Sequence, residues 1–121
     1  MPAFVPANSA VWFEIPVTDL DRARRFYGTV LGNEPSLTEE GPNPMVMLPA
    51  EPEGVSGHLY PGRPASRGTG ATIHLAVSDL EAGLKRVADN GGEVVSEVFS
   101  IPAGRFAYCL DPDGNSFGLF A

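Results

Sequence analysis

The sequence predicts an α+β fold in which two tandem βαβββ modules, residues 1–60 and 61–121, form a curved mixed sheet. An offset of 60 residues pairs "EPEGVSGHLY" (Glu51–Tyr60) with "DPDGNSFGLF" (Asp111–Phe120), and "VTDLD" with "VSDLE". A repeat of this length covers nearly the whole chain in two copies. Residues 61–70, "PGRPASRGTG", have the Pro, Gly and Ser content of a linker between the copies.

The first module begins with a predicted strand over Ala10–Val17, where apolar and less apolar residues alternate. A helix is expected after Thr18, because apolar residues recur at helical spacing up to Leu31 and Gly32 suits a left-handed cap. Three short strands are then expected over residues 34–37, 45–48 and 55–60.

The second module repeats this order, with a strand over residues 72–77 and a helix after it. Ser78 and Glu81 have the spacing of a capping box at the start of this helix, and Gly91 suits its end. Its three remaining strands are expected over residues 94–99, 106–110 and 116–120.

Length and charge restrict the class of protein. A chain of 121 residues has the size of one domain, and its net charge of −7 repels nucleic acid. Arg22, Arg24 and Arg25 are interpreted as the solvated face of a helix. No apolar run approaches the ~18 residues of a membrane span, and the N-terminus lacks the pattern of a secretory signal, so a cytoplasmic protein is expected.

Strand parity separates two faces, because neighbouring residues of a strand point to opposite sides. The odd-numbered residues are apolar and are expected to pack against the helices: Val11, Phe13, Ile15, Leu59, Ile73, Leu75, Phe117 and Leu119. The even-numbered residues mix polar and aromatic side chains: Trp12, Glu14, Ser56, His58, Tyr60, Thr72, His74, Ser116, Gly118 and Phe120. This mixture is typical of the inside of a ligand-binding cup.

Three segments together resemble the vicinal oxygen chelate superfamily, which includes glyoxalase I, extradiol dioxygenases and the bleomycin resistance proteins. They are "FEIPVTDLDRARRFYGTVLG", "IHLAVSDLEAGLKRVADNGG" and "GRFAYCLDPDGNSFGLF". The resemblance implies paired βαβββ modules and a homodimer in which each cup combines the first module of one chain with the second module of its partner.

The resemblance also implies four metal-ligand positions, which hold His or Glu in metal-dependent members. Carried over by motif, they fall on Trp12, His58, Thr72 and Gly118. Only His58 can bind a metal, whereas catalytic sites normally use three protein ligands. The standard site is therefore not intact, and glyoxalase I activity is not expected.

Glu14, His58 and His74 are the candidate catalytic residues, and three interpretations of them stay open. They have the composition of a two-His, one-carboxylate site for a divalent metal. Alternatively, Glu14 and a histidine form a metal-free acid and base. In the third interpretation, Glu14 and His74 are structural groups that pair with each other or with backbone between the modules.

Trp12, Tyr60, Thr72, Arg105 and Phe120 are the candidate ligand-binding residues. The aromatic members can stack on a ligand or serve only in packing, and Arg105 can hold an anionic group or form an ion pair at the sheet edge. Cys109 is expected to be a buried apolar residue and no nucleophile.

These observations favour a homodimer that binds a small organic molecule in its cup, as in the bleomycin resistance group. The alternatives are a lyase, isomerase or dioxygenase-like enzyme that uses Glu14, His58 and His74 with or without a divalent metal, and a scaffold with an unused cup.

Overall fold

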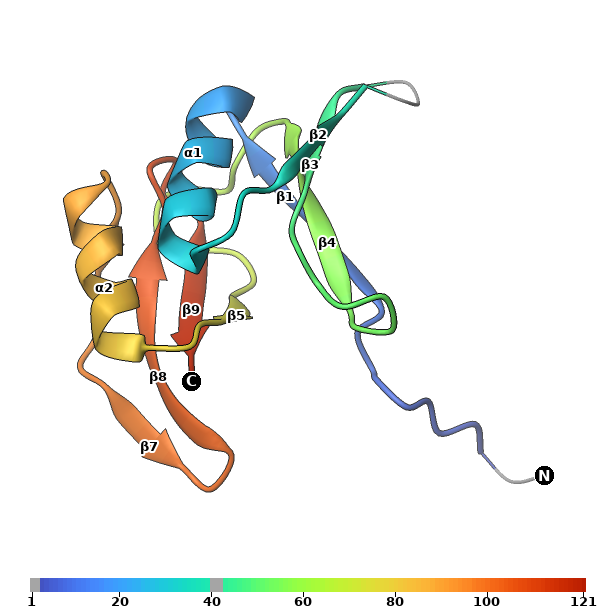
Figure 1. The fold of residues 1–121 in the computed structure, drawn as a ribbon, viewed down its shortest axis with the longest axis vertical. Coiled ribbons are helices and arrows are strands. Elements are labelled where there is room, and N and C mark those ends of the chain that lie inside the picture. Colours follow the sequence, from blue (N-terminus) through green and yellow to red (C-terminus); the bar gives the residue numbers. More distant parts are fainter. Residues whose placement is uncertain (1–2, 40–42) are drawn as a thin grey trace.

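The first module forms a four-stranded sheet with one helix. The computed structural model describes residues 3–39 and 43–121. The strands are β1 (Trp12–Val17), β2 (Ser36–Thr38), β3 (Met45–Met47) and β4 (Ser56–Pro61), and they lie in the order β1-β4-β3-β2. β1 runs parallel to β4, and the other pairs are antiparallel. The helix α1 (Leu20–Leu31) lies between this sheet and the second helix (Figure 1).

The second module repeats this topology with one difference. β5 (Ile73–Ala76) and α2 (Leu80–Asp89) are followed by β6 (Glu93–Val94), β7 (Phe99–Ile101), β8 (Gly104–Leu110) and β9 (Ser116–Phe120). The strand expected over residues 94–99 is therefore two short strands, which both pair with β8. The break has a local cause, because the Ser96 hydroxyl accepts the Tyr108 backbone N–H at 2.9 Å in place of a backbone carbonyl.

The helix ends confirm the predicted C-terminal glycines and correct the N-terminal caps. Gly32 and Gly91 adopt φ values of 74° and 92°, in the left-handed region that favours glycine. Asp19 and Asp79 cap the starts of α1 and α2 by accepting the backbone N–H of the third helical residue. The predicted capping box of Ser78 and Glu81 is wrong, because Asp79 occupies the cap position one residue later.

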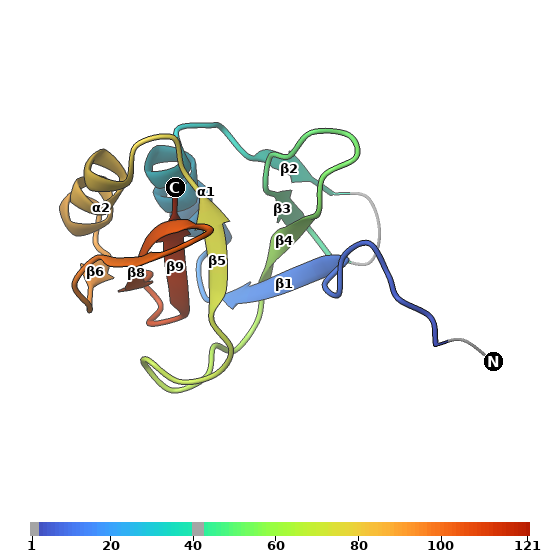
Figure 2. The same ribbon diagram turned by 90° about the horizontal axis from the view of Figure 1, so that it is seen from below.

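The hydrophobic core confirms the predicted parity. Ile15, Leu59, Leu75, Phe117 and Leu119 are buried beneath the helices, so β1, β4, β5 and β9 have their even-numbered faces on the other side. In β3 the parity is inverted, because the even-numbered Val46 pairs with Leu59 and is buried in the core. Val11 departs from the expectation because it precedes β1 and is exposed. The N-terminal segment extends away from the body of the protein (Figure 2). No helix in the described ranges is long and apolar enough to cross a membrane.

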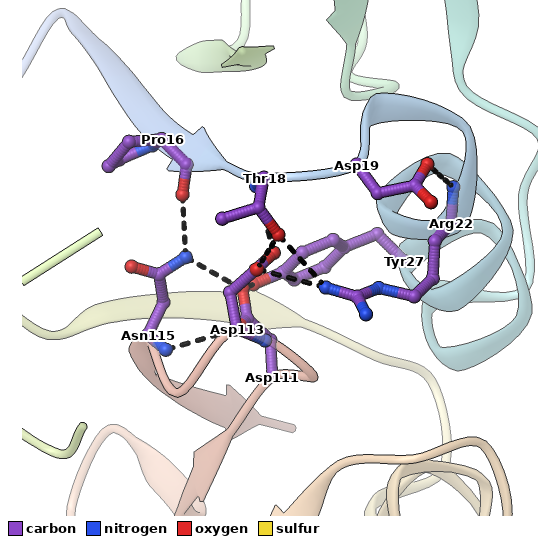
Figure 3. A network of polar contacts seen from close by, with 8 residues as sticks. All are labelled: Pro16, Thr18, Asp19, Arg22, Tyr27, Asp111, Asp113 and Asn115. Carbon is purple, nitrogen blue, oxygen red and sulfur yellow. Dashed lines mark hydrogen bonds and ion pairs between the residues drawn. The ribbon is translucent and has the colours of Figure 1, made fainter. Parts of the chain in front are cut away.

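The turn after β8 joins the two modules (Figure 3). The buried Asp111 carboxylate accepts the Tyr27 hydroxyl at 2.7 Å and the Asn115 side-chain amide at 3.0 Å. The same amide donates to the Pro16 carbonyl at 2.8 Å. These contacts connect the second module to β1 and α1 of the first module.

The neighbouring carboxylate of the turn extends this connection. Asp113 accepts hydrogen bonds from the Thr18 hydroxyl and, at 2.9 Å, from Arg22 Nη2. Arg22 was expected on a solvated helix face and instead takes part in the contact between modules. Arg24 and Arg25 both pair with Asp21 on the exposed side of α1, as the solvated face predicts.

Candidate functional site

The even-numbered face of the first sheet carries a polar group held between aromatic rings. We call Trp12, Glu14, His58 and Tyr60 the first wall. Trp12 Nε1 donates to His58 Nδ1 at 3.0 Å, and His58 Nε2 lies 3.1 Å from Glu14 Oε1. The Cα positions of Glu14 and His58 are direct partners in the parallel pair β1 and β4, which explains why their side chains meet.

These contacts define the tautomer of His58. An indole N–H is only a donor, so Nδ1 of His58 must be the acceptor and carry no proton. Nε2 then carries the proton of the neutral ring, and this nitrogen lies 3.1 Å from Glu14 Oε1. Both ring nitrogens of His58 are engaged and the residue is 8% exposed, whereas the Glu14 side chain is 63% exposed. Glu14 is therefore the group of this chain of contacts that remains available to solvent or ligand.

The even-numbered face of the second sheet surrounds a histidine with aromatic rings. We call His74, Phe106, Tyr108 and Phe120 the second wall. The His74 ring centroid lies 5.3 Å from that of Phe106, 5.6 Å from that of Tyr108 and 6.4 Å from that of Phe120. Phe106 and Phe120 are stacked at 6.0 Å. This wall combines one titratable imidazole with a large apolar surface.

The position of His74 depends on a glycine. Gly118 is its direct partner on β9, and a Cβ at Gly118 would collide with the His74 ring. In the repeat, His74 and Gly118 correspond to Glu14 and His58. The second module thus has its imidazole on the first strand of the module, and the fourth strand provides the space for it.

Phe106 and Tyr108 are site residues that the sequence analysis missed. The predicted even-numbered face comprises residues of the first and fourth strands of each module and none of the strand before the fourth. Phe106 pairs with Phe120 and Tyr108 pairs with Gly118 in the antiparallel register of β8 and β9. Their parity on the predicted strand over residues 106–110 was the signal that could have found them.

The two walls are separate within one chain. The hydrogen bonds and ring contacts of Trp12, Glu14, His58 and Tyr60 stay within the first sheet, and the ring contacts of His74 stay within the second. Glu14 therefore pairs with His58 and not with His74. Among residues 3–39 and 43–121, no three His, Cys, Asp or Glu side chains are close enough to hold a metal ion together.

The residues at the four standard metal-ligand positions do not fit a metal. His58 has both nitrogens in polar contacts, and the space at Gly118 is filled by the His74 ring. The Thr72 hydroxyl is 2.6 Å from the Ser116 hydroxyl, and Trp12 supplies no ligand atom for a metal. These four residues therefore do not form a metal site within one chain.

A cavity of about 610 Å³ between the modules lies apart from the first wall. Phe13, Leu31 and Leu48 line it on one side, and Thr72 and His74 on the other. No residue of the first wall borders this cavity, whereas His74 of the second wall does.

Arg105 and Cys109 lie on the opposite face from the walls. Arg105 forms an ion pair with Glu81 of α2, which raises the pKa of Arg105 and lowers the pKa of Glu81. This is the edge ion pair that the sequence left open. Cys109 is fully buried, and burial raises the pKa of its thiol to about 11. A protonated, inaccessible thiol is a poor nucleophile.

The paired βαβββ modules and their polar and aromatic inner faces define a class of small cup-forming α+β proteins. The sequence profile of the Glyoxalase/Bleomycin resistance protein/Dioxygenase superfamily matches residues 9–119. The chain belongs to this superfamily.

Individual relatives agree with this assignment. CFP32 of Mycobacterium tuberculosis, which bears a glyoxylase name, is 29% identical over 114 residues, or 90% of this chain and 44% of that protein. The anthracycline biosynthesis protein DauV of Streptomyces sp. (strain C5) is 31% identical over 114 residues, or 93% of this chain and 41% of that protein. The chain thus spans less than half the length of these two relatives.

Solved structures show the same fold. A glyoxalase/bleomycin resistance protein from Albidiferax ferrireducens T118 matches with a TM-score of 0.74 and 22% sequence identity, over 93% of this chain and 98% of that chain.

Proposed function

We propose that this protein binds a small organic molecule in a cup formed by the first wall of one chain and the second wall of a second copy. The observation that carries this proposal is the ring of aromatic side chains around His74, on the sheet face that the helices leave open. Apolar rings with a few placed polar groups are typical of small-molecule sites. The name of the superfamily, which includes bleomycin resistance proteins, and that of a relative in anthracycline biosynthesis support an organic ligand.

The separation of the two walls supports the contribution of a second copy. Trp12 is 46% exposed and Tyr108 is 36% exposed, so each wall leaves aromatic surface in water when the chain is alone. In a two-fold dimer, the first wall of each chain would face the second wall of the other chain. The dimer would then contain two identical cups, and all four walls would be covered.

Fluorescence provides a test of binding, because Trp12 is the only tryptophan and lies in the first wall. We expect saturable quenching of Trp12 when the protein is titrated with a planar aromatic probe such as 1-naphthalenemethanol. We expect weaker binding after His74→Ala and unchanged binding after Arg105→Gln, since Arg105 lies on the other face. Equal affinity of the His74→Ala and wild-type proteins would contradict the proposal.

Subunit complementation tests whether one cup uses two chains. Tyr60→Ala and His74→Ala place their changes on different walls, and each is measured alone for loss of affinity for 1-naphthalenemethanol. The two variants are then mixed so that dimers form at random, and about half of the dimers contain one chain of each variant. If the site is shared, one of the two cups in each mixed dimer has both walls intact, so about a quarter of all cups recover. A site within one chain would show no recovery.

A second candidate function is metal-free proton transfer by Glu14 and His58. The 3.1 Å contact between His58 Nε2 and Glu14 Oε1 favours it, because a carboxylate beside an imidazole can exchange a proton with a bound substrate. Lyase and isomerase reactions use such a step. Turnover that survives Glu14→Gln and His58→Leu, measured separately in a screen of small carbonyl compounds, would exclude this function.

A further inference from the structure

We infer that Glu14 is the ligand-recognition group of the first wall and that it selects a ligand bearing a protonated amine. This inference rests on the proposed small-molecule function of the cup and names the ligand class. It starts from the contact chain in which Trp12 Nε1 donates to His58 Nδ1 and His58 Nε2 lies 3.1 Å from Glu14 Oε1.

The contact chain fixes one carboxylate oxygen and leaves the other available. Oε1 of Glu14 lies 3.1 Å from His58 Nε2, the ring nitrogen that carries the proton because Nδ1 accepts from Trp12. No hydrogen bond occupies Oε2 among the described residues, and 63% of the side chain is exposed. A carboxylate held at one oxygen is oriented before the ligand arrives, so it loses less freedom on binding.

The charge of the surrounding surface favours a cation. The even-numbered residues of β1, β4, β5, β8 and β9 include no Lys or Arg, and Glu14 is the acidic residue among them. Arg105, the candidate for holding an anion, pairs with Glu81 on the other face. An anionic ligand would therefore meet one carboxylate and no positive partner on these strands.

The rings beside Glu14 suit the same group. The His58 ring centroid lies 5.8 Å from that of Trp12 and 6.1 Å from that of Tyr60, so two aromatic rings flank the imidazole that contacts the carboxylate. An ammonium group next to both a carboxylate and aromatic faces gains an ion pair and cation–π attraction. The aromatic part of the ligand would then contact the rings of the second wall.

Three matched probes test this inference by calorimetry: 1-naphthylmethylamine as the ammonium, 1-naphthalenemethanol as the neutral compound and 1-naphthoate as the anion. In the wild-type protein we expect the ammonium to bind about tenfold tighter than the alcohol, and the anion to bind weakest. Glu14→Gln should abolish the preference for the ammonium and keep the affinity for the alcohol.

Two substitutions of His58 test whether this residue positions the Glu14 carboxylate. A glutamine side chain in place of His58 can accept from Trp12 and donate to Glu14, so His58→Gln should keep the preference for the ammonium. His58→Leu can do neither and should lower this preference. A variant that merely damaged the fold would lower the affinities for all probes together. Arg105→Gln is the matched surface control and should change none of them.

The outcomes separate the inference from the proposed function. Equal wild-type affinities for ammonium and alcohol, or a preference that persists in Glu14→Gln, would overturn the role of Glu14 and leave the cup in place. Failure of all three probes to bind the wild-type protein would overturn the inference and the proposed cup together.

Discussion

Tyr27 and Asp111 are 84 positions apart, and the Tyr27 hydroxyl donates to Asp111 Oδ2 at 2.7 Å in the interior of the protein. This bond joins a helix of the first module to a turn of the second module. Burial raises the pKa of Tyr27 well above its ordinary value of 10.0, and the adjacent Asp111 carboxylate raises it further.

Tyr27→Phe keeps the ring and removes the hydroxyl. It leaves an oxygen of the buried Asp111 with one donor fewer, so we expect the free energy of unfolding to fall by about 1–3 kcal/mol. Urea denaturation at pH 7 measures this change. Tyr60→Phe, at a partly exposed position of the first wall, is the matched control and should be near neutral.

The same variant predicts a pH dependence of stability. Because the pKa of Tyr27 is higher in the folded state than in the unfolded state, its contribution is present below about pH 10 and is lost as the pH rises above it. The unfolding free energy of the wild-type protein should therefore fall more steeply above pH 10 than that of Tyr27→Phe. Parallel curves for the two proteins would contradict a perturbed Tyr27.

Gly118→Ala tests the packing of His74 in the second wall. The added methyl group would collide with the His74 ring, so we expect a loss of about 1–3 kcal/mol of stability, typical of overpacking. In a His74→Ala background the same substitution should cost much less. A double-mutant cycle with additive effects would show that the two residues do not share this space.

Cys109 should react slowly in the folded protein. The thiol is buried and its pKa is raised to about 11, so little thiolate forms at pH 8. We expect Ellman's reagent to modify Cys109 only slowly in buffer and rapidly in guanidinium chloride. Rapid modification of the native protein would show an opening of the sheet and helix α2 around this residue.

Metal analysis tests the interpretation that Glu14, His58 and His74 form a shifted metal site. One chain brings Glu14 and His58 together and leaves His74 on the other sheet, so such a site needs His74 of a second copy. The proposed cup would bring that residue near, but both ring nitrogens of His58 are already in polar contacts. We therefore expect protein incubated with Mn, Fe(II), Co, Ni or Zn and then gel-filtered to retain no stoichiometric metal. About one metal per cup, lost in His74→Ala, would overturn this expectation.

Much of the fold was predictable because it depends on local pattern and repetition. The alternation in β1 and β5, the glycine after α1 and the offset of 60 residues indicated the strands, the helices and the βαβββ order. The caps were assigned one residue too early because Thr18 and Ser78 precede Asp19 and Asp79, and all these residue types can cap a helix.

The site was predictable only in part, because it depends on register between distant strands. Parity placed Glu14, His58 and His74 on one kind of face, and the parallel pairing of β1 with β4 decided which of them meet. The Trp12 contact and the break between β6 and β7 depend on side-chain hydrogen bonds that no periodicity encodes. The contacts of Asp113 with Thr18 and Arg22 likewise join residues far apart in the sequence, so no local pattern predicts them.

The two repeats differ at the corresponding positions His58 in the first module and Gly118 in the second module. This difference has a geometric consequence. The first wall has its carboxylate and imidazole on adjacent strands, whereas the second wall has one imidazole enclosed by rings. The proposed cup, which combines these two halves, would therefore lack two-fold symmetry in its lining. It would have a charged end and an apolar end, so an elongated amphipathic molecule would enter it in one orientation.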